Sequence, residues 1–164
     1  MDRAVTGFTL VELLVTISII AILAAIGMPS YQSTITGMRM NNEINTLSSD
    51  LSFARSEAIK RGQTVYVCPS SNGTSCNAAN NWSTGWITYA GTTASIVRKN
   101  PGVTHSDTLN GYAAVTVPLP LTPVGYADTT GTISLHNATN DASLRRCVVF
   151  STGAWKMDKG SNCP

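Results

Sequence analysis

An almost uncharged stretch from Phe8 to Met28 constrains this chain more than any other feature. Its 21 residues carry one ionisable side chain, that of Glu12. As a helix rising ~1.5 Å per residue, the stretch would reach about 31 Å. Because the hydrocarbon core of a bilayer is ~30 Å thick, the stretch predicts a membrane-spanning helix near the N-terminus.

The flanking charges suggest an orientation for this helix. Arg3 precedes the stretch and the next cation is Arg39, so the positive-inside rule places the N-terminus in the cytoplasm and the residues after Tyr31 on the other side. A cleavable secretory signal is the alternative, because Ala25-Ile26-Gly27 has the small residues that signal peptidase accepts. Two features oppose it: Asp2 cancels the charge of Arg3, and a carboxylate stands near the start of the hydrophobic core.

Glu12 is the most informative residue of the stretch. A carboxylate in hydrocarbon costs several kcal/mol, about 2.5 to 3.5 for Asp on insertion scales, and it usually marks a function. The stretch itself contains no cation. Cleavage between Gly7 and Phe8 would create an α-amine, which a neighbouring subunit displaced along the membrane normal would present to Glu12. We therefore favour a role in assembly over an accidental acid near the headgroups.

The segment Gly7-Phe8-Thr9-Leu10-Val11-Glu12-Leu13-Leu14 resembles the processing site of type IV pilins and type II secretion pseudopilins. The resemblance implies that a prepilin peptidase removes a leader, residues 1–7, and that the new N-terminal Phe8 is methylated. It implies that residues 8–30 form a transmembrane and assembly helix in which Glu12 acts in filament assembly. Pro29 stands where many pilins have a helix-weakening proline, and its missing N–H and its ring predict a kink.

The pattern of the remaining residues predicts a helix followed by strands. Apolar residues spaced by three and four lie on one face of a helix that ends near Gly62, namely Ile44, Leu47, Leu51, Ala54 and Ala58. We expect this amphipathic half, residues 31–62, to pack on a sheet rather than form a coiled coil. Residues 63–164 form the expected β-rich head of the same domain, and β-branched or aromatic runs predict antiparallel strands at 64–68, 85–89, 95–98, 112–117, 132–136 and 146–150.

Further motifs resemble one branch of this superfamily, the GspH/FimT minor pilins and pseudopilins. They are residues 54–62, Val67-Cys68-Pro69, Trp82, Gly85-Trp86-Ile87, Thr122-Pro123-Val124-Gly125 and Phe150-Ser151-Thr152-Gly153. The resemblance implies an α+β type IV pilin fold, with a long N-terminal helix packed on an antiparallel sheet.

The same resemblance implies a structural subunit of a type IV pilus or a type II secretion pseudopilus, at the tip or in the initiation complex. Its partners would be other pilins or pseudopilins, the prepilin peptidase and the bacterial inner membrane, with the head in the periplasm. Both machines use this N-terminal half, so the sequence leaves the choice between them open. A solitary domain held by a signal anchor is a further alternative.

Four cysteines in a segment destined for the periplasm form an even set, which allows three pairings. Their spacing favours Cys68 with Cys76 and Cys147 with Cys163, because each pair closes a short loop and would stabilise the fold by about 2 to 4 kcal/mol. A zinc site is the alternative, but the ligands come as C-x7-C and C-x15-C rather than as two tight C-x2-C knuckles.

Catalytic and cofactor motifs are missing from the sequence. His105 and His136 lie in polar or strand-like stretches, and neither a Gly-x-Ser-x-Gly elbow, an H-E-x-x-H helix nor a Gly-rich phosphate loop is present. We therefore expect no enzymatic activity and no cofactor. The balance of 11 basic against 9 acidic side chains is too even to indicate a nucleic-acid partner by itself.

A local cluster near the C-terminus suggests an alternative function. The last twenty residues hold four cations and a tryptophan, namely Arg145, Arg146, Lys156, Lys159 and Trp155. Cations bind phosphates with counterion release and a Trp face stacks on bases, so a DNA-binding minor pilin that acts in DNA uptake is the second hypothesis. Against it, members resembling the DNA-uptake branch carry Gly-Arg-x-Arg, whereas Gly153-Ala154-Trp155-Lys156 lacks the first arginine. The competing interpretation is a solvated basic edge with Trp155 packed on the core.

Overall fold

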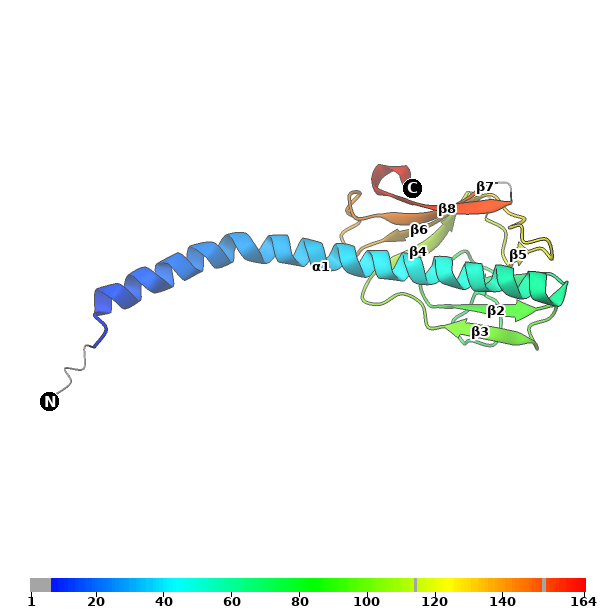
Figure 1. Ribbon diagram of the computed structural model, residues 1–164, viewed down its shortest axis with the longest axis horizontal. Coiled ribbons are helices and arrows are strands. Elements are labelled where there is room, and N and C mark those ends of the chain that lie inside the picture. The colour runs from blue at the N-terminus through cyan, green and yellow to red at the C-terminus, as the bar shows by residue number, and fades with distance from the viewer. Residues whose placement is uncertain (1–6, 114, 152) are drawn as a thin grey trace. The chain divides into compact units, whose positions relative to one another are not determined.

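The computed structural model describes residues 7–113, 115–151 and 153–164, and the side chains of Pro29 and Ser30 are not described. The predicted leader, except Gly7, lies outside these residues, and so does Ala114 of one predicted strand. The chain divides into two compact units, Met1–Gly37 and Met38–Pro164. Helix α1, Leu10–Arg61, contributes its first part to one unit and its second part to the other (Figure 1).

The first unit contains the apolar part of α1. Its large hydrophobic side chains from Phe8 to Met28 are all more than half exposed. This helix is long and apolar enough to cross a membrane by length and composition, with a mean hydropathy of 2.6 over 18 residues. The helix continues through Pro29, and the kink there stays a prediction because its side chain is not described.

In the second unit, one face of α1 is buried. Its apolar side chains are almost fully covered, namely Met40, Ile44, Leu47, Leu51, Ala54 and Ala58. The predicted stripe is thus confirmed, and it begins one step earlier, at Met40. Gly62 stops the helix because its φ of 64° is readily adopted only by glycine.

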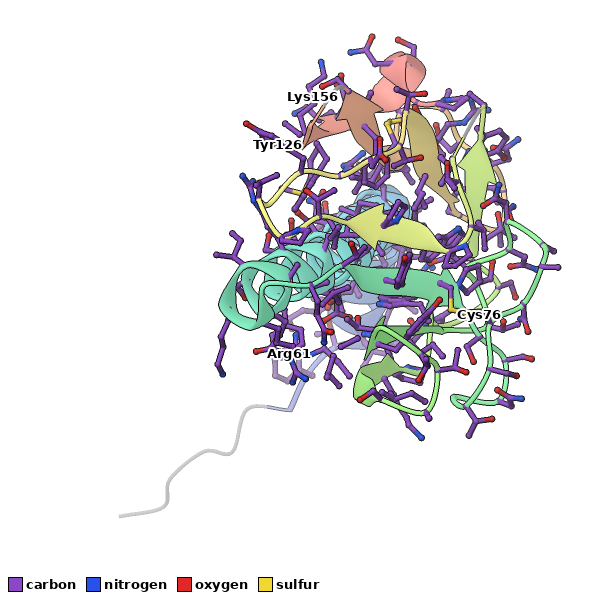
Figure 2. All side chains as sticks on the ribbon, turned by 90° about the vertical axis from the view of Figure 1, so that its right-hand side faces the viewer. Arg61, Cys76, Tyr126 and Lys156 are labelled. Carbon is purple, nitrogen blue, oxygen red and sulfur yellow. A yellow bond between two sulfur atoms is a disulfide. The ribbon has the colours of Figure 1, made fainter. Side chains whose placement is uncertain are left out.

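In the described part of the chain, the strands form two antiparallel sheets of four strands each. The first has the order β3-β2-β1-β5 and the second β4-β6-β7-β8. Their bounds are β1 Val65–Pro69, β2 Trp86–Ala90, β3 Ile96–Asn100, β4 Thr108–Tyr112, β5 Leu119–Leu121, β6 Gly131–His136, β7 Arg146–Ser151 and β8 Ala154–Lys159. A short 3-10 helix follows at Gly160–Asn162. The second part of α1 lies against both sheets (Figures 1 and 2).

Five of the predicted strands are present with shifts of one or two residues, but the strand predicted at 112–117 is wrong. The actual strand, β4, ends at Tyr112, because Ala113 has a φ of 60° and the chain turns. Val115 then contributes to the core instead of a ladder. The sequence pattern did not predict strands β5 and β8. Strand β5 has only three residues, and β8 is rich in charged side chains, so neither shows a run of strand-forming residues.

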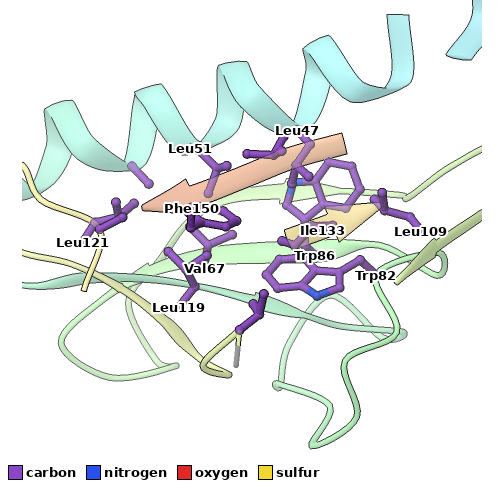
Figure 3. Close-up of a cluster of buried hydrophobic side chains, with 14 of the residues drawn as sticks. Leu47, Leu51, Val67, Trp82, Trp86, Leu109, Leu119, Leu121, Ile133 and Phe150 are labelled. Atoms are coloured by element: carbon purple, nitrogen blue, oxygen red, sulfur yellow. The ribbon is translucent and has the colours of Figure 1, made fainter. Parts of the chain in front are cut away.

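The core fills the space between α1 and the sheets. Leu47 and Leu51 of the helix point toward Phe150 and Ile133 of the second sheet (Figure 3). Val67, a residue of β1 in the first sheet, belongs to the same cluster. Trp82 and Trp86 are 0% and 2% exposed and close the end of this cluster near Leu109. The amphipathic pattern of the sequence therefore explains how the helix is bound to the head.

Two buried carboxylates fix α1 to the head by charged hydrogen bonds. Asp50 accepts from Trp86 Nε1 at 2.8 Å, from Arg98 Nη1 at 2.8 Å and from Asn100 Nδ2 at 3.2 Å. Asp107, which precedes β4, accepts from Arg39 Nε at 2.9 Å and Nη2 at 3.0 Å. A buried carboxylate is tolerated only when it is paired in this way, so both clusters hold the helix in one register on the sheets.

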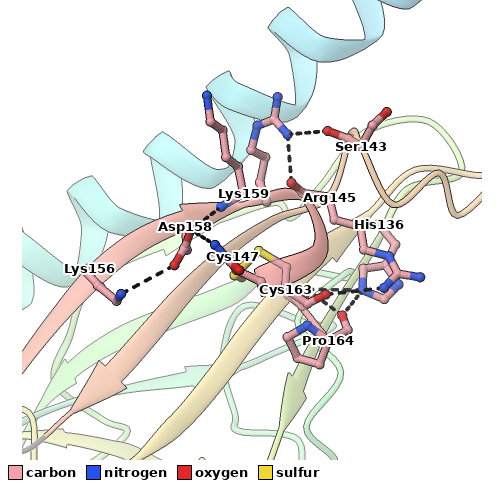
Figure 4. The surroundings of a disulfide bond; sticks show 12 residues. His136, Ser143, Arg145, Cys147, Lys156, Asp158, Lys159, Cys163 and Pro164 are labelled. Carbon is pink, nitrogen blue, oxygen red and sulfur yellow. Dashed lines mark hydrogen bonds and ion pairs between the residues drawn. A yellow bond between two sulfur atoms is a disulfide. The ribbon is translucent and has the colours of Figure 1, made fainter.

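Two disulfides join Cys68 to Cys76 and Cys147 to Cys163, the connectivity that the spacing favours. Cys76 lies in the loop after β1 (Figure 2), and the second bond fastens the C-terminal segment to β7 (Figure 4). All four sulfurs are therefore used in disulfides, which leaves no thiolate for the zinc site considered as an alternative.

Candidate functional site

The Gly7–Phe8 bond lies just before the start of α1. Thr9 caps the helix, because its Oγ1 accepts the Glu12 N–H at 3.2 Å and its carbonyl accepts the Leu13 N–H at 3.2 Å. Gly7, Phe8 and Thr9 are not helical, and the Phe8 side chain is 80% exposed. The peptide bond that a leader peptidase would cut is therefore outside the helix and open.

Glu12 is in the first helical turn, three residues after the cap. The spacing Thr9-x-x-Glu12 is that of a capping box, of which the structure forms the half made by Thr9. An acidic side chain there also suits the positive end of the helix dipole. The carboxylate is exposed, within one turn of the chain end that cleavage would create. Sequence reasoning missed Thr9, although the capping-box spacing was a readable signal.

The part of α1 from Leu10 to Met28 presents apolar side chains around its whole circumference. Two hydroxyls within it are satisfied by the helix itself, since Thr16 donates to the Leu13 carbonyl and Ser18 to the Leu14 carbonyl, each at 2.8 Å. Polar groups that bond internally are what a helix surrounded by lipid or by other apolar helices requires. Glu12 is the one ionisable side chain of this stretch, and it is exposed.

The C-terminal cations are divided between two faces of the β7–β8 hairpin. Arg146 pairs in register with Lys159, on the face whose other β7 members, Val148 and Phe150, are buried in the core that α1 covers. Lys156 points to the opposite face, where its Nζ lies 3.5 Å from Asp158 Oδ2 (Figure 4). The structure therefore does not collect the four cations into one surface.

Arg145 and Trp155 are used within the fold. Arg145 Nη1 donates to the Cys163 carbonyl at 3.3 Å (Figure 4). Trp155 packs on the core beside Phe150, with ring centroids 6.5 Å apart, and the Arg55 guanidinium lies 5.8 Å from its ring centroid. A partly buried ring of this kind supports the interpretation of Trp155 as a core cap rather than a platform for a base.

Asp158 further reduces the positive charge of the hairpin. A hydrogen bond from Asn162 Nδ2 holds the pKa of Asp158 below its usual value, and the Lys159 backbone N–H and Lys156 act in the same direction. The carboxylate therefore stays charged down to a lower pH than an isolated aspartate.

Two family models match the chain. The model of the type II transport protein GspH matches residues 43–154, and that of the prokaryotic N-terminal methylation motif matches residues 2–28. The chain belongs to the GspH/FimT family of minor pilins and pseudopilins. The methylation motif includes Gly7, Phe8 and Glu12, and the family match begins in α1 and reaches the start of β8.

Two solved structures share the fold of this chain. Two crystal forms of the type IV minor pilin FimU from Pseudomonas aeruginosa superpose with TM-scores of 0.57 and 0.58 at 19% identity. The similarity covers 76% of this chain and 96% and 92% of the two FimU chains. At this identity the likeness concerns the fold, and it confirms the type IV pilin architecture of a long helix on antiparallel sheets. Family and fold are those of structural pilins, and the motif match implies assembly with other pilins and processing by a prepilin peptidase.

Proposed function

We propose that this chain is a minor pilin or pseudopilin that is cut between Gly7 and Phe8, methylated on Phe8 and built into a type IV pilus or a type II secretion pseudopilus. The capped helix start carries the proposal: an open Gly7–Phe8 bond stands one turn before Glu12, the one acid of an apolar helix. The new α-amine of a neighbouring subunit would pair with this carboxylate. The pairing would offset the free-energy cost of an unpaired carboxylate in the membrane. A position near the tip or in the initiation complex belongs to the same proposal.

The proposal includes an orientation in the inner membrane. The N-terminus would face the cytoplasm and the head the periplasm, where both disulfides form in an oxidising compartment. Residues 1–7 would be the leader, 8–30 the assembly helix with a kink at Pro29, and 31–62 the half that forms one domain with the head, 63–164.

Mass spectrometry of the chain purified from host membranes tests the proposal. We expect a mature N-terminus at Phe8 that carries one added methyl group. A Gly7→Leu variant is the control and should keep its full length, because the peptidase site is changed while the apolar helix is intact. An unprocessed chain, or one that begins at Met28, would contradict the proposal and favour a signal anchor or a secretory signal.

The second hypothesis, a DNA receptor on the same scaffold, has less support. The structure separates Lys156 from Arg146 and Lys159 and packs Trp155 on the core. We therefore rank assembly first.

A further inference from the structure

A hollow of about 280 Å³ lies between α1 and the β7–β8 hairpin. Asn41, Ile44 and Asn45 line it from the helix, and Arg146, Met157, Asp158 and Lys159 line it from the strands. The Met157 side chain is 52% exposed. The hollow thus combines two cations, one acid and two amides with an apolar side chain that is open to solvent.

The two cations stand directly opposite each other in the ladder, because Arg146 pairs with Lys159. Like charges in such a position destabilise a sheet, so the arrangement calls for a compensating anion. Arg146 is held by three uncharged acceptors: Asn41 Oδ1 at 2.6 Å, the Arg145 carbonyl at 2.8 Å and the Ser143 carbonyl at 3.3 Å. Within the described residues, neither cation has a carboxylate at ion-pair distance. Arg146 is therefore positioned but not neutralised.

Among the described residues that line the hollow, Asp158 is the one acid, and its carboxylate is already engaged. Its Oδ2 lies 3.5 Å from Lys156 Nζ, and its Oδ1 accepts from the Lys159 backbone N–H at 2.9 Å and from Asn162 Nδ2 at 3.1 Å. Because side chains alternate along β8, Asp158 and Lys159 point to opposite faces of the strand, and they form no ion pair. The side of the hairpin that faces α1 keeps its positive charge.

We propose that this hollow receives the side-chain carboxylate of an aspartate or glutamate from the head of a neighbouring pilin subunit. Charge complementarity carries the choice of occupant: the carboxylate would accept from Arg146 Nη2 and from Lys159 Nζ, and charge-assisted hydrogen bonds of this kind are the strong ones. Met157 would cover the aliphatic stem of the entering side chain. The inference rests on the proposed function, because it requires a neighbouring subunit.

A DNA phosphate fits the hollow less well than a carboxylate. Only two cations face it, and at ~0.9 per phosphate contact they imply a log–log salt slope of about −1.8, too shallow for useful DNA binding at physiological salt. Within the described residues no aromatic ring lines the hollow to stack a base.

Zero-length cross-linking with a carbodiimide tests the inference on the full chain in sheared filaments or isolated pseudopili. The carbodiimide adds to a carboxylate, and the Lys159 amine then attacks the activated carbonyl carbon. An amide forms, and the reagent leaves as a urea that has taken up the water lost in the condensation. Because only groups in contact react, we expect peptide mapping to join Lys159 to an Asp or Glu of another pilin subunit. Lys159→Gln should remove at least nine-tenths of this product, and Lys156→Gln, on the other face of the same strand, should leave it unchanged.

Three outcomes would overturn the inference. One is a Lys159 amine that joins only acids of its own chain, and another is a Lys159 that stays unlinked in filaments whose other lysines react. The third is a Lys159 that becomes reactive only after nuclease treatment, which would assign the hollow to DNA. The amount of this chain in the filaments is measured in the same sample. If the chain is absent from them, the proposed function fails; if it is incorporated and Lys159 is not joined to a neighbour, the inference fails alone.

Discussion

Replacing Asp50 by alanine should destabilise the head more than any single change at its surface. The Asp50 side chain is 6% exposed, and its carboxylate accepts hydrogen bonds from Trp86, Arg98 and Asn100, which tie α1 to β2 and β3. Breaking a buried charge pair costs ~3 to 5 kcal/mol. Water can reach Arg98, whose side chain is 41% exposed, so we take the lower end, about 3 kcal/mol.

This loss converts into a shift of the melting temperature. The compact unit, Met38–Pro164, has 127 residues. At ~2.1 cal/mol/K per residue its unfolding entropy is about 0.27 kcal/mol/K, so a loss of about 3 kcal/mol lowers Tm by about 11 °C. Thermal unfolding of a head fragment, residues 35–164, followed by circular dichroism, measures the shift.

Ser49→Ala is the matched control, because Ser49 is the exposed neighbour of Asp50 on the same helix. Its effect should stay within about 0.5 kcal/mol, as is usual for surface changes. A decrease in Tm below about 4 °C for Asp50→Ala, which corresponds to about 1 kcal/mol, would refute the view that this cluster holds the helix on the sheet.

Two further changes test local features. Thr9→Val removes the cap oxygen, which is worth ~0.5 to 2 kcal/mol. It should shift the start of α1, as seen by hydrogen exchange in detergent, and slow leader cleavage, whereas Thr9→Ser should behave as wild type. Equal behaviour of wild type, Thr9→Val and Thr9→Ser would show that the cap is unimportant. Cys163→Ala should expose one titratable thiol, at Cys147, and lower the free energy of unfolding by ~2 to 4 kcal/mol, because the Cys147–Cys163 disulfide closes a segment with a sequence separation of 16. An unchanged denaturation midpoint would contradict this expectation.

Strong local patterns made much of this fold predictable. The membrane helix follows from the absence of charge between Phe8 and Met28, apart from Glu12, and the packed face of α1 follows from spacings of three and four. The cysteine pairs follow from short loops. In each of these the residues that interact are close in sequence, or they share one period, so local physics decides the outcome.

The remainder depends on long-range pairing. Strand β8 has few strand-forming side chains, and only its ladder with β7 makes it a strand. The same pairing places Lys159 opposite Arg146 and sends Lys156 to the other face, which no count of cations in the sequence reveals. Asp50 lies beside the apolar stripe of α1, but its three donors come from residues 36 to 50 positions away.

The role of Glu12 in assembly is the central claim, and its incorporation into filaments tests it most directly. Glu12→Gln keeps the shape and removes the charge, and Asp128→Asn, at an exposed site of the head, is the matched control. Both variants should stay in the membrane and be processed to Phe8. Loss of an ion pair worth ~1.4 kcal/mol or more predicts that the share of Glu12→Gln in sheared filaments falls at least tenfold, while Asp128→Asn matches wild type. Incorporation of Glu12→Gln at the wild-type level would contradict the account.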